Sequence, residues 1–252
     1  MDEIQAHGPL SCTRCFEASE SQSIEANGWR LINDPGLWGA SDPVVLVLGQ
    51  SKGNTQVRQL LGNNFDSVAF AGVRDRLANI LAGISVHFDK ANLGKHFSAS
   101  EQNIAFASLL RCSLSDVNGK TSGSPVMHAM GDAKADAWIV SCMDQWLLRP
   151  NPRLRLVVLL GLTNEYVKRV MSHLQALHPA TFRKMDQSAV SAAGIVWVFV
   201  QHPSRISENH YQRWINSSPH TKRDSIRSRV IQLIDQEPSI RDTGLFGATE
   251  SL

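Results

Sequence analysis

The sequence predicts an α/β fold with three layers (α/β/α), in which helices cover both faces of a central, mainly parallel four-stranded sheet. Two observations lead to this prediction. Four short runs of consecutive apolar residues indicate strands buried on both faces, and a stripe of apolar residues at helical spacing follows each run. Alternating strands and helices are typical of a parallel sheet. A chain of 252 residues is long enough to bury one such core.

The strands and helices can be assigned in chain order. The apolar runs cover residues 43–49, 104–110, 154–161 and 195–200, and the helical stripes lie within 73–81, 139–146, 167–174 and 226–234. In open parallel sheets the functional site lies beyond the carboxyl ends of the strands. The segments to examine are therefore 50–54, 111–116, 162–164 and 201–206.

The remaining segments suggest one domain with a short tail. We expect a single domain over residues 1–237, which includes an N-terminal Cys-x-x-Cys segment. Residues 113–125 are rich in Ser and Gly and predict a surface loop. Residues 238–252 have no periodicity, which predicts a partly disordered tail.

The composition and the first residues argue against a membrane-spanning or secreted protein and leave nucleic-acid binding open. No apolar run reaches the ~18–20 residues of a membrane span, and the first residues, MDEIQAHGPL, lack a signal-peptide pattern. We therefore expect a cytoplasmic protein without a membrane partner, and nothing indicates an obligate protein partner. The net charge is only +2, but residues 205–229 carry six Lys or Arg against two acidic residues. Such a segment is typical either of a phosphate-contacting face or of a solvated helix.

Four cysteines are the only ones in the chain, and their spacing indicates a metal site. Cys12 and Cys15 form a Cys-x-x-Cys pair, Cys112 ends the second predicted strand, and Cys142 lies on the apolar stripe of a helix. Four thiolates suit a [4Fe–4S] cluster or a tetrahedral zinc ion. Zinc sites usually have a second Cys-x-x-Cys pair, whereas 29 residues separate Cys112 from Cys142. Buried cysteines without a metal are the third alternative.

Seven features follow one another along the chain. They are Cys12-x-x-Cys15, Gly49-Gln50-Ser51-Lys52-Gly53, Ala69-Phe70-Ala71-Gly72, Ser108-Leu109-Leu110-Arg111-Cys112, Cys142, Leu160-Gly161 and His202-Pro203-Ser204. In this order they resemble the iron–sulfur members (families four and five) of the uracil-DNA glycosylase superfamily. That family has Gly-Glu-Ala-Pro-Gly, Pro-Phe-Val-Gly, Asn-Val-Val-Lys-Cys, Leu-Gly and His-Pro-Ser at the corresponding places. The resemblance covers roughly residues 10–215.

The resemblance implies a uracil-DNA glycosylase-like fold and a DNA glycosylase activity. Such enzymes flip a nucleotide out of DNA and hydrolyse its N-glycosidic bond, which leaves an abasic site. The resemblance also implies a structural [4Fe–4S] cluster on Cys12, Cys15, Cys112 and Cys142. His202 would donate a hydrogen bond to the leaving base. Phe70 would stack on that base beside Gly49. The plainer interpretations are a histidine that caps a strand end and a core phenylalanine.

The DNA partner would meet the loop after the fourth strand. Ser204, Arg205 and Ile206 would enter the minor groove, with Ile206 as an apolar wedge into the vacated stack. Lys52 and Arg213 are further candidate DNA contacts, although solvated charges explain such residues equally well.

The motifs depart from the family at the position of the water-activating residue. Gln50 and Ser51 replace Glu and Ala, and neither can act as a carboxylate base. A neutral side chain can still orient water toward an oxocarbenium-like centre. Asn54 and Asp66 are the nearby candidates for the missing role, since Asp66 is the only carboxylate between Gly49 and Phe70.

The base-reading position departs as well. Ser108 stands where the family has the Asn that reads uracil, and a bidentate amide contact is worth ~1–3 kcal/mol of discrimination. The loop before Phe70 and the one between Cys112 and Cys142 are also longer than in the family. These changes predict a modified pyrimidine as substrate, such as a hypermodified cytosine of phage DNA, which would make the protein an anti-phage defence enzyme. The alternatives are a uracil-DNA glycosylase of base-excision repair, a non-catalytic lesion-binding relative, and an unrelated α/β protein stabilised by zinc.

Overall fold

The centre of the fold is a parallel sheet made by the four strands that the apolar runs predict. The computed structural model describes residues 6–16, 22–52, 64–118, 125–148, 151–204, 206, 208–216, 222–237, 240 and 245. The central strands are β5 (Val45–Gly49), β6 (Ile104–Ser108), β8 (Leu156–Leu160) and β11 (Ile195–Val200). They lie in the order β6-β5-β8-β11 with every neighbouring pair parallel. Their residues are all buried, as expected of strands covered on both faces.

The main sheet contains eight strands, so the prediction of four strands is wrong in number. Two short antiparallel strands extend the β6 side, β4 (Gly36–Gly39) and β1 (Gly8–Pro9), and two extend the β11 side, β10 (Ala189–Ala192) and β9 (Arg183–Asp186). Each has two to four residues. Runs this short carry no distinct period of their own, and their extended form depends on pairing with a neighbour.

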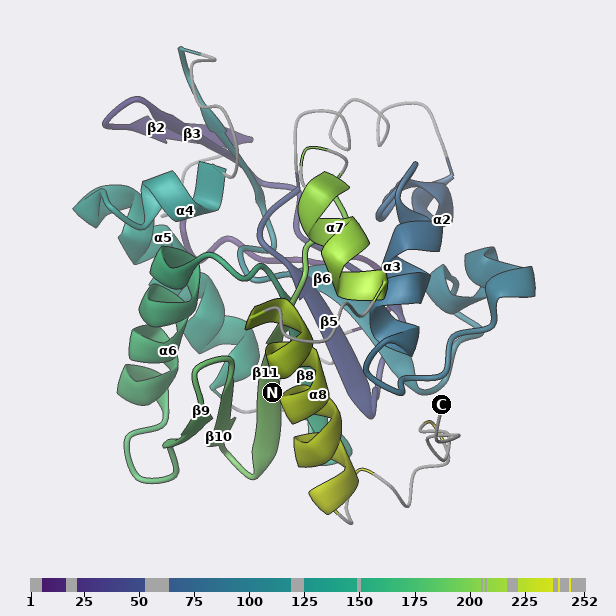
Figure 1. Cartoon of the computed structure of the whole chain (residues 1–252). Coiled ribbons are helices and arrows are strands. Elements are labelled where there is room, and N and C mark those ends of the chain that lie inside the picture. The colour runs from purple at the N-terminus through teal and green to yellow at the C-terminus, as the bar shows by residue number, and fades with distance from the viewer. Residues whose placement is uncertain are drawn as a thin grey trace.

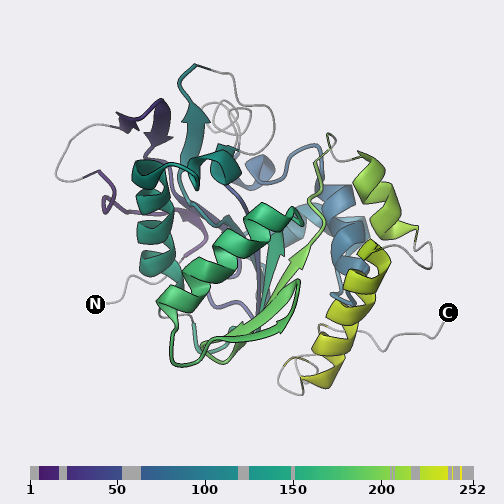
Figure 2. The ribbon, with the colours of Figure 1, turned by 60° about the vertical axis from the view of Figure 1, so that its left-hand side comes forward.

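Helices cover both faces of the sheet, which makes the predicted three layers (Figures 1 and 2). On one face, α5 (Ala133–Leu147) and α6 (Asn164–Leu177) pack against alternate strand residues such as Leu46 and Leu48. On the other, α3 (Arg74–Ala82), α7 (Glu208–Ile215) and α8 (Lys222–Gln236) pack against the residues between them, such as Val45 and Val47. Because successive side chains of a strand point to opposite faces of the sheet, each strand contributes residues to two separate cores.

A second, three-stranded sheet continues from the carboxyl end of β6 (Figure 1). It has the order β2 (Ser23–Ala26), β3 (Trp29–Ile32), β7 (Ser113–Asp116), and both pairs are antiparallel. The prediction of a surface loop over residues 113–125 is therefore wrong for its first four residues. Ser and Asp disfavour strands in isolation, but pairing with β3 overrides that preference here. Residues 119–124 lie outside the described part of the chain.

Shorter helices complete the described structure: α2 (Phe65–Val68), the 3₁₀ helix η1 (Lys90–Phe97) and α4 (Pro125–Ala129). Within the predicted tail, only Ile240 and Leu245 are described. Ile240 is buried in the core on the face that α3, α7 and α8 cover. The carbonyl of Leu245 accepts a hydrogen bond from the backbone of His87 at 2.8 Å. Among the described helices, none is both long and apolar enough to cross a bilayer.

Candidate functional site

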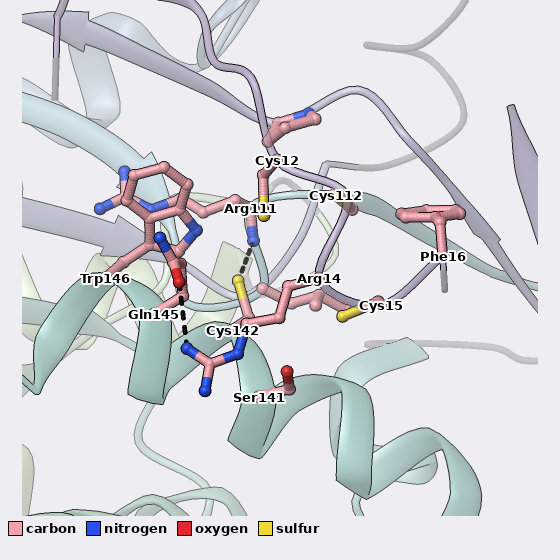
Figure 3. A pocket seen from close by; sticks show the side chains of 12 residues that line it. Cys12, Arg14, Cys15, Phe16, Arg111, Cys112, Ser141, Cys142, Gln145 and Trp146 are labelled. Carbon is pink, nitrogen blue, oxygen red and sulfur yellow. Dashed lines mark hydrogen bonds between the residues drawn. The ribbon is translucent and has the colours of Figure 1, made fainter. Parts of the chain in front are cut away.

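The four cysteines line one pocket, although they come from three distant segments. Cys12 and Cys15 belong to the N-terminal segment, Cys112 follows β6, and Cys142 lies on α5. None of them forms a disulfide. Their sulfurs lie around a common space in Figure 3. The convergence expected from the spacing is therefore observed, whereas a metal in this pocket remains a proposal.

The surroundings of the sulfurs are apolar and cationic. Phe16, Pro35, Leu110 and Trp146 contribute to the pocket wall. The backbone N–H of Arg111 donates to Sγ of Cys142 at 3.2 Å (Figure 3). The guanidinium of Arg111 is only 2% exposed and lies 5.8 Å from the centre of the Trp146 ring. An apolar wall with a positive charge and an N–H donor suits a site that concentrates negative charge on sulfur.

Burial raises the pKa of three of these thiols. It raises the pKa of Cys142 to about 12 and moves the pKa of Cys112 well above its ordinary range, and it also raises the pKa of Cys15. Nearby thiols raise all three values further. As bare thiols these groups stay protonated at neutral pH, so a bound metal would have to displace their protons.

Four thiols around one pocket are a donor set that suits a [4Fe–4S] cluster or a tetrahedral zinc ion. The pocket is partly open to solvent. A tetrahedral zinc ion with Zn–S bonds of 2.3 Å would hold its sulfurs only about 3.8 Å apart. In a four-iron cluster each thiolate binds a different iron, so the sulfurs stand farther apart. In the described part of the chain, no group of three or more His, Cys, Asp or Glu is arranged to hold one metal ion.

A second set of predicted residues meets at the carboxyl ends of the parallel strands. Gly49 ends β5 and pairs in register with Ser108, which ends β6 and is buried. The Phe70 ring lies against Gly49, so that a Cβ there would be 3.5 Å from its Cζ. Phe70 itself has φ of 53°. This left-handed conformation is uncommon for an aromatic residue, and strain of this kind often occurs at functional sites.

The Gln50 side chain links the end of β5 to the end of β8. Its side-chain amide donates to the carbonyl of Leu160 at 3.4 Å. Gly161 follows with φ of 151°, and a Cβ there would lie 2.8 Å from Gln50 Nε2 and 2.9 Å from the Tyr166 ring. Only glycine therefore allows this close approach. Ser51, the next residue after Gln50, is half-buried.

His202 lies two residues beyond β11, at the same edge of the sheet, and is half-buried. The backbone N–H of Ser204 donates to its Nδ1 at 3.1 Å. Burial lowers the pKa of His202 to about 4, and the Arg76 guanidinium adds to this effect. The imidazole is therefore neutral at pH 7. Because Nδ1 accepts a hydrogen bond, the proton resides on Nε2, which becomes the free donor of the ring.

Arg76 of α3, which the sequence interpretation missed, holds the loop after His202. Its guanidinium donates to the carbonyl of Ser204 at 3.2 Å, forms an ion pair with Glu208 and lies 3.9 Å from the centre of the Tyr211 ring. No local motif marks Arg76, because its partners are more than 120 residues away. Ile206, inside this loop, is 87% exposed and is far more exposed than any other large apolar side chain in the described residues.

Two predicted residues are engaged elsewhere. The Asp66 carboxylate pairs with His7 at 2.9 Å, and His7 Nδ1 accepts from the backbone of Gly39 on β4 at 3.2 Å. The Asp66 carboxylate is thus engaged by a residue bound to β4, which β6 separates from β5. Lys52 is only 2% exposed, and its ammonium lies 3.2 Å from Asp34. Lys52, predicted to contact DNA, is thus engaged with Asp34 and exposes almost none of its side chain.

The remaining candidates are exposed or undescribed. Arg213 lies on the exposed side of α7, which follows the His202 loop. Asn54 and Arg205 lie outside the described residues.

Comparisons with known proteins add no family to this geometry. Neither the models of known protein families nor the curated proteins give a match for this chain.

Proposed function

We propose that the chain is a DNA glycosylase that hydrolyses the N-glycosidic bond of a flipped-out modified pyrimidine. The observation that carries this proposal is the state of His202. A neutral imidazole with its proton on Nε2, held at the carboxyl edge of a parallel sheet, is a donor suited to an anionic leaving base. A charged imidazolium would bind any anion. The neutral imidazole of His202 instead forms a stronger hydrogen bond only as negative charge develops on the leaving base.

The neighbouring residues suit the other parts of the reaction. Phe70 provides an aromatic surface beside Gly49 on which a base can stack. Gln50 and Ser51 directly follow Gly49 in the chain and would orient the water that attacks C1′ of the sugar. The C–N bond breaks as the base leaves with the electron pair, and the water, after losing a proton to solvent, becomes the hydroxyl of the abasic sugar.

The exposed Ile206 supports a duplex as substrate. A single exposed aliphatic side chain is common on protein surfaces, so the support comes from the position of Ile206 in the chain. It lies four residues after His202, where insertion into the base stack would hold the flipped nucleotide in place. The small Ser108 side chain beside Gly49 leaves more room than an amide would, which favours a base larger than uracil.

The cysteine pocket would hold a [4Fe–4S] cluster with a structural role. Bound there, the cluster would supply a cross-link between the N-terminal segment, the strand after β6 and α5. Zinc is the alternative metal, and elemental analysis of the purified protein distinguishes them. Iron with a brown colour supports the cluster, and zinc without iron contradicts it.

The direct test is a glycosylase assay on labelled duplexes that contain uracil or a hypermodified cytosine. We expect abasic sites from the modified base and a large loss with His202→Ala, while His128→Ala, an exposed histidine on α4, serves as the matched control. Activity on uracil alone would instead indicate a repair enzyme. Equal activity of His202→Ala would contradict the mechanism.

A non-catalytic, lesion-binding protein is the second candidate. The observation in its favour is that Asp66, the one carboxylate proposed to replace the family's base, pairs with His7 instead. Tight binding to a modified duplex without any abasic product would establish this function.

A further inference from the structure

A buried ionic group joins the cysteine pocket to the turn that follows β5. It consists of Lys52, Asp34 and Ser113. Asp34 accepts hydrogen bonds from Ser113 N at 2.8 Å and from Ser113 Oγ at 2.6 Å. Its Oδ1 also lies 3.2 Å from Lys52 Nζ. Ser113 directly follows Cys112, so the group lies next to a cysteine of the pocket.

The backbone makes the same connection. Beyond the ends of the strands, Leu109 N donates to Gly49 O at 2.8 Å and Leu110 N donates to Gln50 O at 3.1 Å. Lys52 then forms an isolated parallel bridge with Ser113. The turn that carries Gln50 and Ser51 is therefore paired at three places with the segment that carries Cys112.

The ion pair between Lys52 and Asp34 lies in a poorly solvated place. Asp34 is mostly buried, and Lys52 is almost completely so. The Asp34 carboxylate holds Ser113, the residue after Cys112, through two hydrogen bonds. Removal of the Lys52 charge would leave this carboxylate uncompensated and would disturb the segment that it holds.

We infer that Lys52 is a positioning residue of the cysteine centre: its ion pair with Asp34 holds Ser113, and with it the adjacent Cys112, in place and ties the Gln50 turn to that centre. The inference rests on the metal centre of the proposed function. It gives the Lys52 position, which is Pro in the family that the sequence resembles, an electrostatic task in this chain. No contact with DNA is required of it.

The test measures metal content, not activity. Lys52→Met keeps the length and apolar stem of the side chain but removes its charge. We expect the iron content per chain to fall below half that of the unaltered protein, and the remaining iron to be lost several-fold faster to a chelator. Lys168→Met, an exposed lysine on α6, is the matched control and should lose nothing.

The double variant Lys52→Met with Asp34→Asn separates charge balance from simple misfolding. It removes both charges, so we expect it to recover most of the iron that Lys52→Met loses. Additive losses in the double variant, or normal iron retention by Lys52→Met, would overturn the inference. An unaltered protein that purifies without iron would instead contradict the cluster of the proposed function.

Discussion

Protonation of His202 should weaken the folded state, and the effect can be isolated by substitution. Burial lowers the pKa of this imidazole to about 4 in the folded protein, against about 6.5 in an unfolded chain. The unfolded state therefore binds a proton at a higher pH than the folded state does. The stability that depends on neutral His202 is complete above pH 6.5 and is lost as the pH falls toward 4.

The size of the effect follows from these two values. At 1.36 kcal/mol for each pKa unit, full protonation would remove at most about 3.4 kcal/mol. Between pH 7.5 and 5.5 the expected loss from this residue is about 1.3 kcal/mol. Most carboxylates do not titrate in this pH range. The expected loss of stability requires only that the pKa of His202 in the folded protein lies well below 5.5.

The perturbation is His202→Asn, because the asparagine oxygen can still accept the hydrogen bond from Ser204 N. Urea unfolding of both proteins at pH 7.5 and 5.5 gives the free energy of unfolding. We expect the unaltered protein to lose about 1.3 kcal/mol more than the variant over this range. His128→Asn, on the exposed surface of α4, should behave as the unaltered protein. Identical losses in all three proteins would refute the assignment of a neutral, half-buried His202.

Three further predictions concern other parts of the molecule. Cys142→Ser should abolish most of the iron content and lower the melting temperature, since Cys142 is fully enclosed among the pocket residues; iron retained at the level of the unaltered protein would contradict this. Ile206→Ala should change stability by less than about 0.5 kcal/mol, because the side chain is exposed, but should reduce cleavage of duplex DNA at least about ten-fold relative to single-stranded DNA. An equal effect on both substrates would argue against a wedge. Gly161→Ala should cost about 1–3 kcal/mol in urea unfolding, because its φ is positive and its Cβ would meet Gln50 and Tyr166; an unchanged midpoint would show that the contact relaxes freely.

The central sheet could be predicted from the sequence because its signal is local. The runs at β5, β6, β8 and β11 are apolar throughout, and burial on both faces requires that pattern whatever the neighbours are. The helices α3, α5, α6 and α8 were equally visible from their apolar stripes. The Cys-x-x-Cys pair indicates a metal site by itself, but the spacing leaves buried cysteines without a metal open, and it is the family resemblance that implies a single site for all four.

What only the tertiary structure decided depends on partners distant in the chain. The edge strands β1, β4, β9 and β10 are too short to form without a neighbour, and β7 is a strand only because β3 lies beside it. Lys52 looks like a surface lysine in the sequence, yet folding buries it against Asp34. Arg76 acquires its role from contacts with Ser204 and Glu208, which are far from it in the sequence. Apolar burial is determined by residue type and period, whereas the pairing of a charge or an edge strand is determined by which groups the packed chain brings within a few ångströms.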